Sequence, residues 1–240
     1  MNIFLSCTKR RTVSMKGNKK TSNLQTFLTV LFVSCFLISN VLATKQFALP
    51  FGITMTGAVI VFPITYILSD LFSEVYGYKW SRATCYMAFG MNLLMVGAFQ
   101  LAIVLPPASF WQGQEAFILT LGSAPRILFA SLLAYVAGDF ANDKVFAKMK
   151  TAHSGDLNGF GARAILSSLV GETCDSCIFI PLAFAGTMPI KALVIMGVTQ
   201  ITLKTLYEII IFPVTRFATK VTQKYENKEN INAQKNSKGT

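Results

Sequence analysis

The stretch VFPITYILSDLFSEVYGY, residues 61–78, combines an apolar run with two carboxylates. Asp70 and Glu74 are four residues apart, so a helix would place them on one face. Pro63 lies inside the apolar run, where a proline removes a backbone donor and favours a bend. Ionisable groups in or near a membrane span are costly and usually face a cavity or a partner. The stretch therefore predicts a bent membrane helix with carboxylates facing a polar interior, although Glu74 could equally lie in water at the helix end.

The composition around this stretch is that of an integral membrane protein. Of 240 residues, 52% are hydrophobic and 14% are charged, with a mean hydropathy of +0.50. A soluble domain would carry nearer a quarter of charged residues. The cysteines are scattered and mostly lie in apolar runs, so they predict no disulfide framework. Cys174 and Cys177 form a lone CxxC, which fits small residues on one helix face better than zinc or redox chemistry.

Apolar runs of about twenty residues, the length that a bilayer core requires, predict an all-α bundle of six transmembrane helices. A signal peptide ending near Ala43 is the alternative for the first run, which is long for a signal core. The expected organisation is a basic disordered tail at 1–23, the six-helix domain at 24–217 and a disordered tail at 218–240. The expected spans are 24–43, 53–72, 83–105, 122–141, 162–185 and 192–217, with a short interfacial helix at 119–121.

The distribution of positive charge predicts the orientation. Eighteen of the 22 lysines and arginines fall in the two tails and in alternate loops, whereas the opposite loops hold Lys45 and Lys191 and the spans hold Arg126 and Lys204. Cytoplasmic loops carry the excess of lysine and arginine. We therefore expect both termini in the cytoplasm and the protein in the cell (inner) membrane. The net charge of +11 then needs no nucleic-acid partner.

A set of ionisable residues remains in or at the ends of the spans. Each costs about 2.5–3.5 kcal/mol at a helix centre. Glu172 and Asp175 are three apart, and two carboxylates that close repel unless they share a proton, a cation or a donor-rich ligand. The excess of negative charge suits a cation or a ligand rich in N–H donors. The set is Asp70, Asp139, Glu172, Asp175 and Glu208, against Arg126 and Lys204.

Both basic members of this set have simpler explanations. Lys204 and Glu208 are four apart, so an intrahelical ion pair is the alternative to a binding role. Arg126 lies near the outer end of its predicted span and could extend its charge into the headgroup region.

Five short motifs occur along the chain in one order: SNVLATK at 39–45, SDLFSEVYGY at 69–78, AYVAGDFAND at 134–143, GETCDSCIFI at 171–180 and LKTLYEIIIFP at 203–213. With Arg126, they make the chain similar, over roughly residues 24–217, to the queuosine precursor transporter family, the YhhQ-like or VUT family of small six-helix membrane proteins. The resemblance implies a transporter without enzymatic activity or a cofactor. Its implied cargo is a 7-deazaguanine base (preQ0, preQ1 or queuine) taken up for tRNA modification.

Such a base offers adjacent N1–H and amine donors, which one carboxylate accepts through two parallel hydrogen bonds. The amines of preQ1 and queuine are cations near neutral pH and would pair with a second carboxylate. Under this resemblance we hypothesise that Glu172 and Asp175 bind the base and that Asp70 or Glu208 binds the amine or a coupling proton. Donors to the O6 edge could come from Arg126, Lys204 or Asn40, aromatic faces from Phe62, Tyr66, Phe179 and Tyr207, and secondary or gating roles from Glu74, Asp139 and Pro63.

Two other functions fit parts of the sequence. Gly138-Asp139 faintly resembles the GxGD motif of intramembrane aspartyl proteases, with Asp70 as partner, but Val136 replaces the first glycine and no span holds a histidine. A substrate-binding subunit of an energy-coupling-factor importer is also a small six-helix protein. Its scaffold contact needs small residues at AxxxA spacing, which residues 24–43 lack. A homodimer and an inverted repeat of two three-helix halves stay open.

Overall fold

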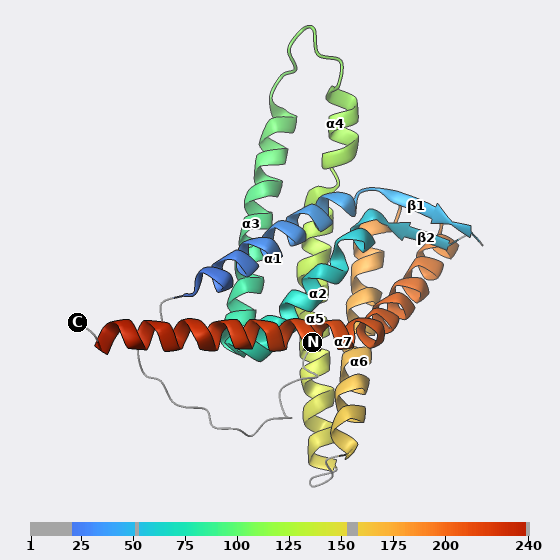
Figure 1. The fold of residues 1–240 in the computed structure, drawn as a ribbon. Helices are drawn as coiled ribbons and strands as arrows, with labels where there is room; N and C mark the ends of the chain where they lie inside the picture. Colours follow the sequence, from blue (N-terminus) through green and yellow to red (C-terminus); the bar gives the residue numbers. More distant parts are fainter. Residues whose placement is uncertain (1–20, 51–52, 153–157, 239–240) are drawn as a thin grey trace.

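The computed structural model describes residues 21–50, 53–152 and 158–238, so the tail predicted at 1–23 falls almost wholly outside it. Within these residues the protein is mainly helical, which confirms the all-α class (Figure 1). Two short strands and two irregular turns complete it. The elements are α1 (Asn23–Leu42), β1 (Gln46–Leu49), β2 (Ile53–Thr56), a 3₁₀ turn (Gly57–Ile60), α2 (Phe62–Leu71), a π-helical turn (Phe72–Tyr76), α3 (Tyr78–Val104), α4 (Gln114–Leu121), α5 (Ala124–Ala152), α6 (Asn158–Phe184) and α7 (Ile190–Lys238).

Four helical segments in the described residues are long and apolar enough to cross a bilayer. This supports a multi-pass membrane protein. The count of six spans and the position of the termini stay predictions. The four segments are Asn23–Leu42, Tyr78–Val104, Gln114–Asn142 and Ile190–Tyr207.

The second predicted span, 53–72, is wrong over its first half. β1 and β2 pair as an antiparallel hairpin, with Gln46 opposite Thr56 and Leu49 opposite Ile53. The β-branched residues of β2 favour a strand. An average of hydropathy does not distinguish an apolar strand from an apolar helix, so it predicted a span here. The remaining α2 has 10 residues, so it rises about 15 Å and cannot cross the hydrocarbon core by itself.

Pro63 also has a different role from the predicted bend. It occupies the first turn of α2, where its missing N–H would have no helical partner anyway. The proline therefore starts this helix instead of bending it. A second difference is that α7 continues as helix through Lys238, across the stretch that its composition led us to expect as disordered.

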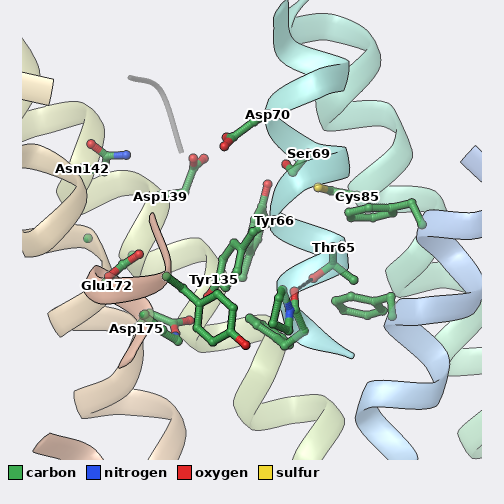
Figure 2. Close-up of a pocket in the computed structure, with 18 of the residues that line it drawn as sticks. Thr65, Tyr66, Ser69, Asp70, Cys85, Tyr135, Asp139, Asn142, Glu172 and Asp175 are labelled. Carbon is green, nitrogen blue, oxygen red and sulfur yellow. Dashed lines mark hydrogen bonds and ion pairs between the residues drawn. The ribbon is translucent and has the colours of Figure 1, made fainter. Parts of the chain in front are cut away.

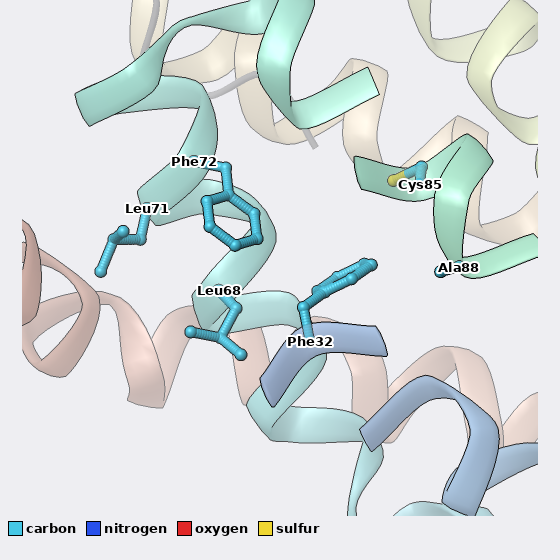
Figure 3. Close-up of a cluster of buried hydrophobic side chains, with 6 residues drawn as sticks. All are labelled: Phe32, Leu68, Leu71, Phe72, Cys85 and Ala88. Atoms are coloured by element: carbon cyan, nitrogen blue, oxygen red, sulfur yellow. The ribbon is translucent and has the colours of Figure 1, made fainter. Parts of the chain in front are cut away.

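The core that holds the first half of the bundle joins α1, α2, the π-helical turn and α3. Figure 3 shows Phe32 of α1 against Phe72, with ring centroids 5.8 Å apart in an edge-to-face arrangement. Edge-to-face aromatic pairs add to the free energy gained by burial. The cluster consists of Phe32, Leu68, Leu71, Phe72, Cys85 and Ala88. It holds α2 in place although α2 is too short to be anchored by the bilayer.

In the second half, α5 and α6 lie side by side (Figure 1) and approach through glycine. A Cβ atom on Gly171 would lie 2.9 Å from Cβ of Asn142 and 3.0 Å from the carbonyl oxygen of Gly138. The first distance is shorter than real Cβ contacts and the second is at the tight limit, so a side chain here would force a shift. Small residues at helix interfaces allow the backbones of membrane helices to approach closely. The contact positions Asp139 of α5 and Glu172 of α6 toward the same space.

We expect Gly171→Val to push α5 and α6 apart and to destabilise the protein by about 1–3 kcal/mol, the usual cost of overpacking. Thermal unfolding of purified protein in detergent measures the change. Gly97→Val is the matched control, because nothing lies within 4 Å of a Cβ atom built there. Equal melting temperatures for the two variants would contradict the close approach.

A polar cavity as the candidate functional site

Two adjoining cavities lie inside the helix bundle. The first has a volume of about 190 Å³ and is bounded by parts of α1, α2, α3, α5, α6 and α7 (Figure 2). The second, of about 170 Å³, extends from it toward the β-hairpin and the 3₁₀ turn. Phe62, Tyr66, Asp175 and Lys204 are among the residues that line both, so the two cavities share part of their wall.

The first cavity has an acidic lining. Among the described residues around it are four carboxylates and one ammonium group: Asp70, Asp139, Glu172, Asp175 and Lys204. Figure 2 shows the carboxylates of Asp70, Asp139 and Glu172 directed into the space between α2 and the α5–α6 pair. A low-dielectric wall concentrates the field of such groups. The cavity therefore favours a cation or a ligand that presents N–H donors.

One ion pair crosses the cavity from α7 to α6. Nζ of Lys204 lies 2.6 Å from Oδ2 of Asp175, and the two side chains are 16% and 29% exposed. The same ammonium lies 5.8 Å from the ring centroid of Phe62. Glu172 and Tyr66 are close enough to interact with it electrostatically. Lys204 thus has a partner on another helix, which the sequence interpretation of a pair with Glu208 on its own helix did not anticipate.

A second ion pair joins α3 to α5 at another part of the wall. Arg82 donates to Oδ2 of Asp139, and its guanidinium lies 5.2 Å from the ring centroid of Tyr78. Sequence reasoning missed Arg82 because it counted as an ordinary loop charge. The sequence did contain a signal for this pair. Asp139 lies near the cytoplasmic end of one predicted span and needs a charged partner, and Arg82 directly precedes another predicted span at its cytoplasmic end.

Several buried polar side chains also border the first cavity. Asn142 is 6% exposed and Thr215 is 3% exposed. Within the described residues, neither Oδ1 of Asn142 nor the hydroxyl of Thr215 has a hydrogen-bond partner. Buried polar groups are nearly always hydrogen-bonded to protein, water or ligand. These two atoms therefore mark positions where a bound molecule or water would gain hydrogen bonds. Neither residue was predicted from the sequence.

Aromatic rings supply the apolar part of the lining. The rings of Phe62 and Tyr66 pack edge to face with centroids 4.8 Å apart, and Phe89 and Tyr135 lie 5.4 Å apart. Figure 2 shows Tyr66 and Tyr135 at the cavity. Flat faces of this kind can stack on a planar ligand, while the hydroxyls offer hydrogen bonds. Tyr135 is a further lining residue that sequence reasoning missed.

Most predicted site residues lie together. The first cavity is lined by Asp70, Asp139, Glu172, Asp175, Lys204, Pro63, Phe62, Tyr66 and Tyr207, and the second also by Asn40 and Phe179. Glu74, in the π-helical turn, lines neither cavity, and burial raises the pKa of its carboxyl. Glu208 lies on α7, but its side chain is outside what the structure describes.

Arg126 has a structural role in this arrangement. Its Nε and Nη2 donate to the carbonyl oxygens of Leu182 and Ala185, each at 2.6 Å, and it lines neither cavity. These carbonyls belong to the end of α6, where helical partners run out. Arg126 therefore caps α6, away from the position that a ligand-binding donor would need.

The family of the chain follows from its sequence match. The sequence profile of the family described as "Putative vitamin uptake transporter" matches residues 56–218, which include most of the residues that line the cavities. The chain belongs to this family. The description of this family supports transport and does not support the hydrolase alternative.

One relative carries a more specific description. A protein of Bacillus subtilis (strain 168) named "Probable queuosine precursor transporter" is 26% identical to this chain over 143 residues. The match covers 58% of this chain and 60% of the relative, so the chain spans less than two thirds of the length of that protein. No solved structure matches.

We expect Lys204→Met to destabilise the protein by about 3 kcal/mol, because it leaves the Asp175 carboxylate in a poorly solvated site. Asp175→Leu added to Lys204→Met should restore much of the loss. Thermal unfolding of the singles and the double in detergent gives the coupling free energy. Lys191→Met, at an exposed lysine, is the control and should change stability little. A double mutant no more stable than Lys204→Met would argue against the pair.

Proposed function

We propose that this protein imports queuosine precursors, the 7-deazaguanine bases preQ0, preQ1 or queuine, across the cell membrane for tRNA modification. The observation that carries the proposal is the acidic, aromatic-lined cavity in a member of an uptake transporter family. The name of the Bacillus subtilis relative supports the same substrate class. The cavity also has the polar and planar surfaces that a flat, donor-rich heterocycle needs.

In this proposal Glu172 binds the guanine-like edge. Its carboxylate lines the first cavity and is positioned by the close α5–α6 contact, so it can accept the N1–H and the exocyclic amine through two parallel bonds. Asp175 is engaged with Lys204, and we assign it a positioning role. The Lys204 ammonium then remains near the base as a donor to its O6 edge.

Asp70 is our choice for the amine of preQ1 or queuine, since its carboxylate reaches the same cavity from α2 on the opposite wall. Tyr66 and Tyr135 supply ring faces between the two acidic walls. A coupling proton would use Asp70 or Asp139, because protonation of a carboxylate is the simplest way to change the charge of the site. Six spans, cytoplasmic termini, the inner membrane and a homodimer belong to this proposal as expectations.

The experiment uses cells that cannot synthesise deazaguanines. We expect expression of this protein to restore queuosine in tRNA, detected by slowed migration on boronate gels, when preQ0, preQ1 or queuine is supplied separately at nanomolar concentration. The base that restores queuosine most efficiently identifies the physiological substrate. No restoration by any of the three, with the protein present in the membrane, would contradict the proposed function.

Glu172→Gln should abolish this uptake, and Asp175→Asn should reduce it strongly, because each removes a charge from the proposed base-binding wall. Glu115→Gln is the control, since Glu115 is exposed on α4 and lines neither cavity. All variants are compared at equal membrane abundance. Wild-type uptake by both Glu172→Gln and Asp175→Asn would show that the base is bound elsewhere.

A further inference from the structure

The long helix α7 has two parts with different environments. A stretch apolar enough to cross a bilayer begins at Ile190 and reaches at least Tyr207, whereas the helix itself continues to Lys238. Figure 1 shows the helix descending from the hairpin side and then turning to run across the bundle toward the C-terminus. Pro213 lies inside the helix, and proline is the usual cause of a sharp helix kink. The segment after this proline, residues 214–228, is here called the crossing helix.

One stripe of the crossing helix faces the protein and is polar. Thr215, Thr219 and Thr222 are buried at three- and four-residue spacing. Farther along the same stripe, Oε1 of Glu226 accepts a hydrogen bond from the hydroxyl of Tyr76 at 2.8 Å. The hydroxyl of Ser22 donates to the same oxygen. The crossing helix is therefore attached to the start of α1 and to the turn that follows α2.

A second stripe is apolar and faces away from the protein. Val214, Phe217, Val221 and Tyr225 are 53%, 69%, 52% and 52% exposed. Their spacing places them on one side of the helix. The stripe continues the exposed apolar face of the spanning part of α7, which includes Leu206 and Ile210. An apolar face that is continuous with a lipid-facing one indicates that lipid covers it too.

A third stripe is basic and runs parallel to the apolar one. Arg216, Lys220, Lys224 and Lys228 are all exposed and follow one another at four-residue spacing. The first three stand directly before Phe217, Val221 and Tyr225, so about 100° of helix rotation separates the stripes. Apolar and basic faces side by side are characteristic of helices that lie in the membrane interface.

We propose that the crossing helix lies in the surface of the membrane, with its apolar stripe among the acyl chains and its basic stripe on the phosphates of anionic phospholipids. Charge complementarity selects the lipid class, because juxtamembrane lysines and arginines are attracted to anionic headgroups. Long basic side chains can extend from the interface to reach those groups. The inference uses only the geometry of α7 and does not depend on the identity of the cargo.

Brominated lipids test this in the full-length protein, because bromine quenches tryptophan fluorescence by contact. Val221→Trp places a tryptophan on the apolar stripe, and Asn227→Trp places one at an exposed position off that stripe. Both are reconstituted in vesicles of brominated phosphatidylcholine, with and without phosphatidylglycerol, and compared with the unsubstituted protein to subtract Trp80 and Trp111. We expect quenching at position 221, strengthened by phosphatidylglycerol, and none at 227.

Charge neutralisation tests the lipid class. Lys220→Gln, Lys224→Gln and Lys228→Gln together should abolish the effect of phosphatidylglycerol on Val221→Trp. The same three-charge change at Lys144, Lys148 and Lys191, which are exposed elsewhere, should leave it intact. Quenching that ignores phosphatidylglycerol, or that is equal at 221 and 227, would overturn the proposal. Absence of quenching at 221 together with a dimer in detergent would also overturn it, by assigning the apolar stripe to a second copy of the chain.

Discussion

The ion pair between Lys204 and Asp175 is the constraint around which the interior of this helix bundle is arranged. Each charge alone would be costly inside an apolar bundle. Paired, the ammonium of α7 and the carboxylate of α6 can both lie in the interior. Both members of the pair line the acidic cavity and also the cavity bordered by the hairpin.

The helices around the pair are positioned by contacts of different kinds. Glycine lets α5 and α6 approach until a Cβ atom would clash, which places Asp139 and Glu172 near each other. The short α2 is held by an aromatic core instead of by the bilayer, and it carries Asp70 to the opposite wall.

The sequence predicted the acidic interior well because its signals are local. A carboxylate in an apolar run is visible without knowing the fold, and this reasoning found Asp70, Asp139, Glu172 and Asp175. The partners were harder to predict, since they come from other helices. Lys204 of α7 pairs with a carboxylate of α6, and Asp139 of α5 pairs with an arginine of α3. Arg126 donates hydrogen bonds to carbonyl oxygens at the end of α6. The β-hairpin was missed because its residues have the hydropathy of a span, and the C-terminal helix because its lysines, asparagines and glutamines resemble a disordered tail.

The central claim is that the acidic cavity binds the base with Glu172 and its amine with Asp70. Equilibrium binding of preQ1 and preQ0 to purified protein tests it most directly, because only preQ1 carries a cationic amine. Glu172→Gln should weaken binding of both bases by roughly tenfold or more, the effect of losing a charged hydrogen bond. Asp70→Asn should weaken preQ1 binding and leave preQ0 binding unchanged. Wild-type affinity for both bases in both variants would contradict the account.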